Sequence, residues 1–420
     1  MCGICGGTRW DRRSYDIFNA TSSRGKDYGN LFVRGTSWIC NHRAIPTTEK
    51  WSPEKNQPFG TDYKVVHNGM IANDKELGNV DQIDSSVLSK VLSFSSIEQF
   101  VNSLSLIVGS FAIAVMKPNG HFYLACNYKP IWVMVDGSEI YFTSLPEFFG
   151  GCGGPDLLPG PKIFRLPPYS AIDTETLKQI RLPRKAFDAA VVVASGGLDS
   201  TAVAAYACEN HSRVCLLHFQ YGCLAENKET DRITKIAQEL VKTFPKTKTE
   251  IQFLPIDYGF AKNSSTLLDG KEKISESIAG SEYAHEWVPA RNLVMLSLAT
   301  AFAEANDFSY IYLGTNLEEG GAYPDNEEQF IRDFNSCLWG AVQNGKKIEV
   351  RSPLGSMMKH EIVAFGLKHN APFEHTWSCY RNGEKACGHC GPCYMRQKAF
   401  LRNGLLDPVD YEERISEDEQ

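Results

Sequence analysis

The chain has 420 residues, of which 43% are hydrophobic and 22% are charged, a composition typical of a soluble globular protein. That length predicts two domains with separate cores, and the formal net charge of -7 excludes a bulk electrostatic attraction to nucleic acid or to an anionic membrane. There is no run of 18 consecutive apolar residues and no signal-peptide pattern at the start, so we expect a cytoplasmic protein.

The chain opens with the sequence MCGICGG, which places Cys2 directly after the initiator methionine. Removal of Met1 would give Cys2 a free α-amino group beside its thiol. An α-amino group has an ordinary pKa of roughly 8, so it can accept the thiol proton near neutral pH. The opening therefore predicts a nucleophile that carries its own base, although a cysteine at position 2 is more often an accident of the start.

Apolar runs rich in β-branched residues follow one another through the first half, and the turn sequences KPNG and VDGS separate several of them. That pattern is typical of antiparallel hairpins. One segment, residues 84–106, has the pattern of a helix. A stretch rich in glycine and proline over residues 150–170 then leads to a change of pattern near Lys185. Residues 1–184 are therefore predicted to form one α+β domain.

Three places in this domain supply what a thiol nucleophile needs. The sequence HNG ends a strand-like run, so Asn68 and Gly69 offer an amide side chain and a backbone N–H to an oxyanion. Arg43 could hold a substrate carboxylate, and Asp84 could hold a substrate ammonium. Taken alone, Asn-Gly is usually a turn and a lone arginine usually lies on the surface. Their combination with Cys2 favours an active site.

The first 180 or so residues resemble the class II glutamine amidotransferases in the MCGI opening and in the blocks NHRAIPT, HNGMIAN and DSSVLSKVL. The resemblance implies an N-terminal-nucleophile domain with an αββα fold. It implies that Cys2 attacks the amide of glutamine and that Asn68 and Gly69 stabilise the oxyanion. It further implies that Arg43 and Asp84 hold the amino acid end of glutamine. The product would be ammonia.

Short buried strand-like runs alternate with amphipathic segments in the second half. Strands are predicted at residues 189–195, 214–220, 250–256 and 310–316, and helices at 201–210 and 229–244. This alternation predicts a doubly wound α/β domain with a parallel sheet over residues 185–420.

The sequence SGGLDST lies between the first of these strands and the first helix. Its glycines let the backbone approach an anion, and the helix start adds N–H donors, although a plain strand-to-helix turn is the alternative. The loop lacks the lysine of a Walker P-loop and resembles the PP-loop of the ATP pyrophosphatases. That resemblance implies Mg²⁺ at Asp199. The implied ATP-binding residues are Ser195, Gly196, Gly197, Asp199, Ser200 and Thr201.

The chain has 13 cysteines, an odd number, and four of them crowd one stretch near the C-terminus. Cys379, Cys387, Cys390 and Cys393 have the spacing C-x7-C-x2-C-x2-C, which suits a tetrahedral ion. This spacing predicts a zinc site, and four thiolates leave no open position, so the metal would be structural. His389 lies inside the motif and is surplus to it. A free-standing zinc finger is the competing interpretation.

Residues from about 186 to 402 resemble the 7-cyano-7-deazaguanine synthases, the QueC family. The blocks that carry the resemblance come in order: SGGLDST, HFQYG, WVPARNLVMLSLA, LGTNLEEGGAYPDNEEQF, SPLGSMMKHEI and CGHCGPCYMR. The family adenylates 7-carboxy-7-deazaguanine and lets ammonia displace AMP, then activates the amide again to form the nitrile. The resemblance implies that Lys359 approaches phosphate. The other implied substrate-binding residues are Arg291, Asn292, Tyr323, Pro324 and Asp325.

Two departures bear on the product. Cys223 follows Gly222 where family members usually carry glutamine, and the glutamate that follows is displaced to Glu226 or Glu229. Stand-alone synthases also lack an amidotransferase half. The fusion predicts glutamine- and ATP-dependent amidation of a 7-deazaguanine derivative, with a 7-amide, a nitrile or an archaeosine-type formamidine as the product.

Other functions stay open at this point. One is a QueC-like antiviral defence enzyme that joins the 7-carboxyl group to a protein amine, and another is a decayed enzyme that serves as a zinc-dependent interaction module. An activity like that of asparagine synthetase fits the two halves but not the four cysteines. We expect glutamine and a 7-deazaguanine small molecule as ligands. The final acceptor could be the free base, tRNA, DNA or a protein, no membrane partner is expected, and a homodimer is compatible with the resemblance.

Overall fold

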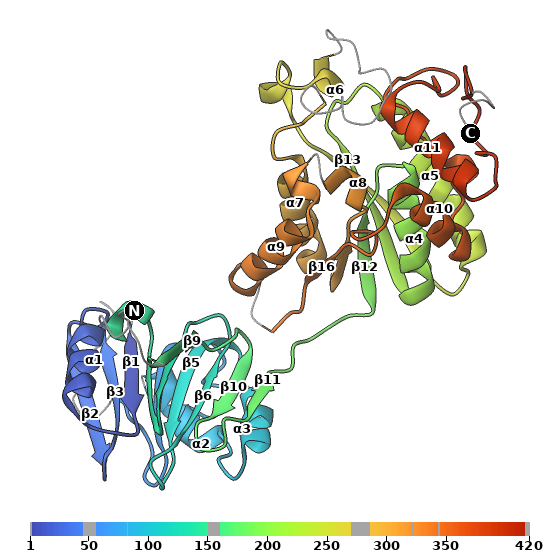
Figure 1. Ribbon diagram of the computed structural model, residues 1–420. Helices are drawn as coiled ribbons and strands as arrows, with labels where there is room; N and C mark the ends of the chain where they lie inside the picture. The colour runs from blue at the N-terminus through green and yellow to red at the C-terminus, as the bar shows by residue number, and fades with distance from the viewer. Residues whose placement is uncertain are drawn as a thin grey trace. The chain divides into compact units, whose positions relative to one another are not determined.

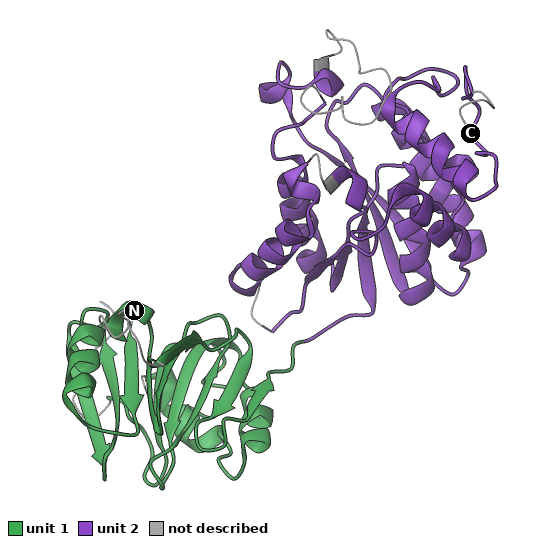
Figure 2. Ribbon diagram, viewed as in Figure 1, with its two compact units in different colours: residues 1–184 green, residues 185–420 purple. Residues whose placement is uncertain are grey.

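The structure is a computed structural model that describes residues 2–44, 56–81, 83–149, 160–269, 286–320, 323–342 and 345–415. The chain divides into two compact units, Met1–Arg184 and Lys185–Gln420 (Figure 2). Each unit has its own hydrophobic cores, so each is treated as a separate body.

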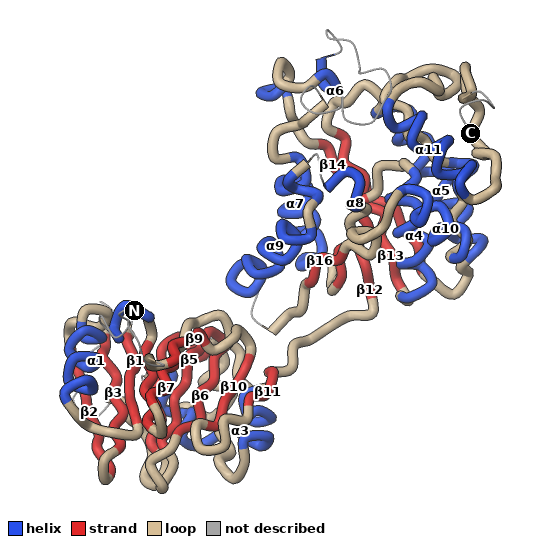
Figure 3. Tube along the Cα trace, in the orientation of Figure 1, coloured by secondary structure: helices blue, strands red, loops and turns tan. Residues whose placement is uncertain are grey.

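The first unit contains two antiparallel sheets. The larger has the strand order β2 (Tyr28–Arg34), β3 (Ser37–Arg43), β1 (Gly3–Gly7), β8 (Glu139–Thr143), β7 (Trp132–Asp136) and β9 (Lys162–Arg165). The smaller has the order β11 (Gln179–Arg181), β10 (Ser170–Asp173), β6 (Phe122–Cys126), β5 (Gly109–Met116) and β4 (Lys64–Ile71). The strand that follows Cys2 therefore lies in the middle of the larger sheet (Figure 3).

Helices cover the outer faces of these sheets (Figure 1). Between the sheets lies a core that includes Ile4 and Val66. Helix α1 (Arg12–Ser22) packs Ile17 on the outer face of the larger sheet. Helix α3 (Ile97–Leu104) stacks Phe100 on Tyr123 of the smaller sheet, with ring centroids 5.3 Å apart. The four layers are helix, sheet, sheet and helix, which is the expected αββα arrangement.

The continuous helix expected over residues 84–106 is wrong. The structure has a 3-10 turn (Asp84–Val87), a short helix α2 (Leu88–Val91) and then α3. Leu92 leaves the helix with ψ of 135°, and Ser96 caps α3 by accepting a hydrogen bond from the backbone N–H of Gln99. Serine side chains compete for backbone donors in this way, so the serine-rich sequence between the helices ends one and begins the next.

The stretch of residues 150–170, expected to be a connection, holds β9 and the start of β10. Strand β10 is buried and pairs with β6, whereas β9 and β11 lie at the edges of the two sheets and are largely exposed. Strand β9 has four residues and β11 three, too short for a pattern of apolar and polar residues to identify either in the sequence. Residues 150–159 lie outside the described residues.

The second unit is built on a parallel sheet with the order β14 (Lys248–Pro255), β13 (Arg213–Gln220), β12 (Ala189–Val193), β15 (Tyr310–Tyr312) and β16 (Glu349–Arg351). One face is covered by α4 (Leu198–Asn210), α5 (Glu226–Thr243), α10 (Lys359–Lys368) and α11 (Gly391–Arg402). The other is covered by α7 (Arg291–Ala305) and α9 (Glu328–Ala341). The predicted doubly wound sheet is confirmed, with the four predicted strands in it.

The chain winds outward from β12 in both directions, so the strand order reverses between β12 and β15. In open α/β sheets a crevice opens at such a reversal, beyond the carboxyl ends of the strands. Among the described residues, no helix combines the length and the apolar character that a bilayer crossing requires.

Candidate active sites of the two units

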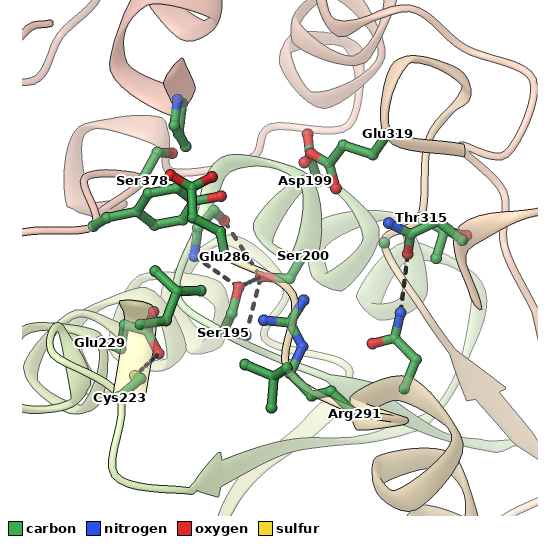
Figure 4. A pocket seen from close by; sticks show the side chains of 18 of the residues that line it. Ser195, Asp199, Ser200, Cys223, Glu229, Glu286, Arg291, Thr315, Glu319 and Ser378 are labelled. Atoms are coloured by element: carbon green, nitrogen blue, oxygen red, sulfur yellow. Dashed lines mark hydrogen bonds between the residues drawn. The ribbon is translucent and has the colours of Figure 1, made fainter. Parts of the chain in front are cut away.

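A cavity of about 300 Å³ opens at the strand reversal of the second unit (Figure 4). The segments that follow β12, β13 and β15 contribute Ser195, Tyr221 and Thr315 to its walls. Short helix α8 (Leu317–Gly320), α7 and the segment before α11 complete it. The cavity therefore lies where the topology predicts a ligand.

The SGGLDST segment forms one wall of this cavity. Helix α4 begins with Gly197 as its N-cap, and Gly197 has no side chain to cap the first turn. The Ser195 hydroxyl accepts a hydrogen bond from the Gly197 N–H at 3.2 Å and lies 3.1 Å from the Ser200 hydroxyl. The remaining N–H groups of the first turn are donors for an anion, and the helix dipole favours negative charge there.

Gly196 and Thr201 shape the loop without lining the cavity. Gly196 has φ of +79°, a conformation that favours glycine, and its carbonyl accepts the N–H of Trp377 at 2.9 Å. Thr201 donates its hydroxyl to the Gly197 carbonyl at 2.8 Å. The six residues expected at the phosphates thus form one turn, of which four face the cavity.

Lys359 links Asp199 of this turn to Glu319 of α8. Its ammonium lies 2.6 Å from Oδ2 of Asp199 and 3.0 Å from Oε1 of Glu319. Burial lowers the pKa of Lys359, but the two carboxylates outweigh burial and raise that pKa above its ordinary value, so the side chain is charged. The other carboxylate oxygen of Asp199, Oδ1, is buried without a hydrogen-bond partner among the described residues.

Carboxylates outnumber cationic side chains around the cavity. The acidic lining residues are Asp199, Glu229, Glu286, Glu318, Glu319 and Asp325, and the basic ones are Arg291, Lys359 and Arg396. This excess would repel a bare triphosphate, so such a ligand has to arrive with a counter-cation. Mg²⁺ fits, because it binds one or two carboxylates together with phosphate oxygens. Asp199 Oδ1 is a carboxylate oxygen without a hydrogen-bond partner among the described residues, so it is available as a metal ligand.

Four of the residues expected at the substrate line the cavity: Arg291, Asn292, Tyr323 and Asp325. Arg291 donates to the Tyr221 hydroxyl at 3.4 Å. The Asn292 backbone N–H donates to Oδ2 of Asp325 at 3.2 Å, so Asp325 caps the start of α7. Tyr323 lines the cavity, whereas Pro324 starts a 3-10 turn beside it and does not.

Trp287 and Glu229 were not among the predicted site residues, yet both line the cavity. The Trp287 ring is stacked with Tyr323 at 14° and 5.9 Å, which gives the cavity a flat aromatic side. Trp287 begins the block WVPARN, so the sequence held the signal. Burial raises the pKa of Glu229 to about 7, and that of the Cys223 thiol to about 12. Cys223 is therefore a protonated neighbour of Glu229, 3.7 Å away, and no nucleophile.

The four cysteines near the C-terminus converge. Their sulfur atoms all lie within 4.8 Å of one another, and all four residues are buried. Backbone N–H groups of Arg381 and Cys387 donate to the sulfur of Cys379 at 3.4 Å. His389 instead holds the carbonyl of Cys387 with Nδ1 at 3.0 Å. The donor set is that of a closed tetrahedral metal site, and zinc suits it.

The candidate glutaminase site is built on β1 and its neighbours. Gly3 pairs with His42, so the register places Arg43 of β3 beside Cys2, one residue beyond the last pair. Strand β4, which carries Asn68 and Gly69, contacts β1 from the facing sheet. Nδ2 of Asn68 is buried and has no hydrogen-bond partner among the described residues, as expected of a donor reserved for an absent acceptor.

Gly69 and Asp84 fix the end of that strand. Gly69 has φ of +156°, and a Cβ atom there would lie 1.9 Å from the Ser110 carbonyl oxygen. Asp84 accepts the N–H of Ile71 at 2.6 Å and the N–H of Ser85 at 2.8 Å, so it lies at the end of β4. Arg24, which was not predicted, interacts electrostatically with Cys2. It follows α1, far from any motif, and nothing in the local sequence marks it.

Comparison with known proteins gives consistent matches. The family model described as queuosine biosynthesis protein QueC matches residues 189–404. A 7-cyano-7-deazaguanine synthase of Sulfolobus acidocaldarius is 42% identical over 414 residues, which cover 92% of this chain and 86% of that protein. One from Saccharolobus solfataricus is 41% identical over 413 residues, with the same coverage.

A shorter relative matches only part of the chain. The 7-cyano-7-deazaguanine synthase of Methanosphaerula palustris is 37% identical over 227 residues, 53% of this chain and 99% of that protein. Among solved structures, the allosteric regulatory enzyme of purine biosynthesis covers 60% of this chain and 80% of its own, with 14% identity and a TM-score of 0.36. At that score the likeness carries no argument. The longer relatives span both units, whereas the shorter one spans about half of this chain.

Proposed function

This chain belongs to the QueC family, and from that membership we propose that it is an ATP-dependent ligase that converts a 7-carboxy-7-deazaguanine to its amide and nitrile with ammonia released from glutamine. The observation that carries the proposal is the cavity at the strand reversal. It combines an uncapped helix start with the buried Lys359–Asp199 pair, beside a flat aromatic wall. Relatives that match along 92% of the chain bear the name of that synthase.

The activation step uses the α4 turn. A carboxylate oxygen of the substrate attacks the α-phosphorus of ATP, pyrophosphate leaves, and an acyl-adenylate forms. The Gly197–Ser200 turn and Lys359 would hold the phosphate oxygens, and Asp199 would hold Mg²⁺, which neutralises charge on the departing pyrophosphate. The ring stack of Trp287 and Tyr323 offers a face for a planar heterocycle.

The second step needs ammonia and a proton acceptor. The ammonia nitrogen attacks the acyl carbon, the bond to AMP breaks, and the nitrogen loses a proton. Glu229, with a pKa of about 7, can take up such a proton near neutral pH. A second ATP then activates the amide oxygen, pyrophosphate leaves, and the loss of AMP and of both protons from the amide nitrogen gives the nitrile.

The first unit would supply the ammonia. The α-amino group of Cys2 takes the thiol proton, and the sulfur attacks the glutamine amide carbon. Asn68 Nδ2 and the Gly69 N–H stabilise the oxyanion, while Arg43 and Asp84 hold the amino acid end. The intermediate collapses, the C–N bond breaks, and ammonia leaves with the proton held by the α-amino group. Water then releases glutamate from the thioester. Ammonia is a nucleophile only while unprotonated, so a source within the same chain raises its useful concentration.

A product assay with three proteins tests this function. The wild-type chain, Cys2→Ala and the control Cys337→Ala, at an exposed cysteine of the second unit, are incubated with glutamine, Mg-ATP and 7-carboxy-7-deazaguanine. Mass spectrometry follows glutamate, AMP and the 7-amide and 7-cyano bases. We expect all four products with wild type and Cys337→Ala. Cys2→Ala should form neither glutamate nor the 7-amide and 7-cyano bases. Ammonium chloride at pH 8 should restore the two bases but not glutamate.

Two outcomes would contradict the proposal. If glutamine-dependent product persists in Cys2→Ala, Cys2 is not the nucleophile. AMP could also form while the 7-carboxyl group gains no nitrogen, even with ammonium chloride present. The adenylate would then react with another acceptor, and the proposed amide and nitrile products would be wrong.

A further inference from the structure

A second group of metal-ligating side chains lies in the first unit, on the outer face of its larger sheet. Cys5 of β1 pairs directly with Cys40 of β3, and His42 lies two residues further along the same strand, on the same face. The two sulfur atoms and one imidazole nitrogen all lie within 4.8 Å of one another. Helix α1 covers this face.

The three residues are deeply buried. Cys5 and Cys40 are 0% exposed and His42 is 3% exposed. The nitrogen Nε2 of His42 is buried and has no hydrogen-bond partner among the described residues. A buried imidazole nitrogen without a partner costs free energy, so its position needs an explanation. A metal ligand is one, because a metal takes the lone pair of a neutral imidazole nitrogen.

The packing around His42 holds its ring in place. The ring lies 4.6 Å from the ring of Phe18, centroid to centroid, on the α1 side. On the neighbouring strand, Gly29 faces the ring, and a Cβ there would lie 2.7 Å from Nδ1. The absence of a side chain at position 29 is what admits the imidazole next to the two sulfurs.

We propose that Cys5, Cys40 and His42 bind one thiophilic d10 metal ion, Zn²⁺ or Cu⁺. Around one ion with sulfur at about 2.3 Å and nitrogen at about 2.1 Å, the ligand atoms lie roughly 3.6 to 4.0 Å apart in tetrahedral or trigonal geometry, so side-chain movements of about 1 Å or less suffice. Two thiolates neutralise Zn²⁺, which would take a fourth ligand from water, whereas Cu⁺ is satisfied by three soft ligands. Hard cations such as Mg²⁺ are excluded by this donor set.

The ion would join the strand that carries the nucleophile to its neighbour. Cys5 lies three residues after Cys2, and His42 pairs with Gly3, the residue that follows Cys2. A bond across β1 and β3 at this point would fix the position of the Cys2 thiol relative to Arg43. This consequence rests on the proposed glutaminase, whereas the metal site itself does not.

Metal content and ligand spectroscopy of the full chain test the site. The protein is loaded with Zn²⁺ or Cu⁺, freed of loosely bound metal, and measured by elemental analysis and by X-ray absorption at the metal edge. We expect about two ions per wild-type chain, one of them in the four-cysteine site, and an imidazole signal that four thiolates cannot produce. Cys5→Ala/Cys40→Ala should hold one ion and lose the imidazole signal, whereas Cys126→Ala, at another buried cysteine, should retain both.

The wild-type spectrum keeps the test decisive even where a variant fails to fold. The proposal is overturned if wild-type protein shows an imidazole signal with neither zinc nor copper. A Cys5–Cys40 disulfide found by peptide mass spectrometry would also overturn it. The arm that shows the signal identifies the ion. Because these readouts do not use activity, a failure of the proposed glutaminase leaves them unchanged.

Discussion

At the scale of single residues, Asn68 is expected to matter much for activity and little for stability. Its side-chain Nδ2 is buried without a partner, so the folded state gains no hydrogen bond from it. Asn68→Ala should therefore change the free energy of unfolding by about 1 kcal/mol or less. It should lower kcat for glutamine hydrolysis about 10²- to 10³-fold, because an oxyanion donor is lost.

Urea unfolding and a glutaminase assay on the same preparation measure both quantities. Asn41→Ala is the matched control, since Nδ2 of Asn41 donates to the His67 carbonyl at 3.2 Å. That variant should lose about 1 to 2 kcal/mol and retain most of its kcat. A large stability loss in Asn68→Ala with kcat retained would remove Asn68 from the oxyanion site.

Glu229 makes a second prediction at this scale, on pH. Burial raises its pKa from 4.5 to about 7 in the folded state, so folded protein binds a proton that unfolded protein releases between these values. The stability contributed by this group therefore falls as pH rises from about 4.5 to 7. Glu229→Gln removes the effect. At pH 8 the free energy of unfolding of the variant should exceed that of wild type by up to about 3 kcal/mol, and by less if solvent contact weakens the effect of burial on Glu229. At pH 4.5 the two values should not differ.

Chemical denaturation at several pH values measures this difference. Glu239→Gln, on the same helix but outside the cavity, must not reproduce the gain. A difference between Glu229→Gln and wild type that stays constant with pH would show that folding does not change the pKa of Glu229.

At the scale of elements, Lys359 holds three helices together at the cavity. It begins α10 and pairs with Asp199 of α4 and Glu319 of α8. Lys359→Met would leave Asp199 and the partly exposed Glu319 facing each other without a cation, so we expect a loss of about 1 to 3 kcal/mol at pH 7 and a several-fold higher KM for ATP. The stability loss should shrink at pH 5, where the carboxylates can protonate. Lys359→Met/Glu319→Gln should recover part of it, and an unchanged loss at both pH values would contradict this account.

The elements also show what local sequence can and cannot predict. Strands buried on both faces, such as β12 and β13, are continuous apolar runs and were predicted. The edge strand β9 has three of its four residues exposed and no regular alternation, so only its pairing with β7 makes it a strand. The break between α2 and α3 depends on the hydroxyl of Ser96, a single capping group within an otherwise helical pattern.

At the scale of the whole molecule, motifs predicted which residues gather, but not how they pair. Asp199 and Lys359 are 160 positions apart, and only the folded sheet brings them to 2.6 Å. The sequence did not predict the Cys5, Cys40 and His42 cluster for the same reason, because Cys5 is far from the other two residues along the chain. The four-cysteine site was predicted because its ligands lie close together in sequence.

Because the two units have separate cores, we expect damage to the four-cysteine site to affect only the second unit. A chelator would remove metal from both proposed sites, whereas Cys390→Ser changes the four-cysteine site alone. The cysteines pack with Trp377, whose backbone N–H donates to the Gly196 carbonyl, so the loss of Cys390 should loosen the cavity wall that is proposed to bind ATP. Calorimetry of the full chain should show a lower melting temperature for the second unit only, with adenylation lost and glutaminase retained. A parallel loss of glutaminase would show that the two units fold as one cooperative body, against the division of their cores.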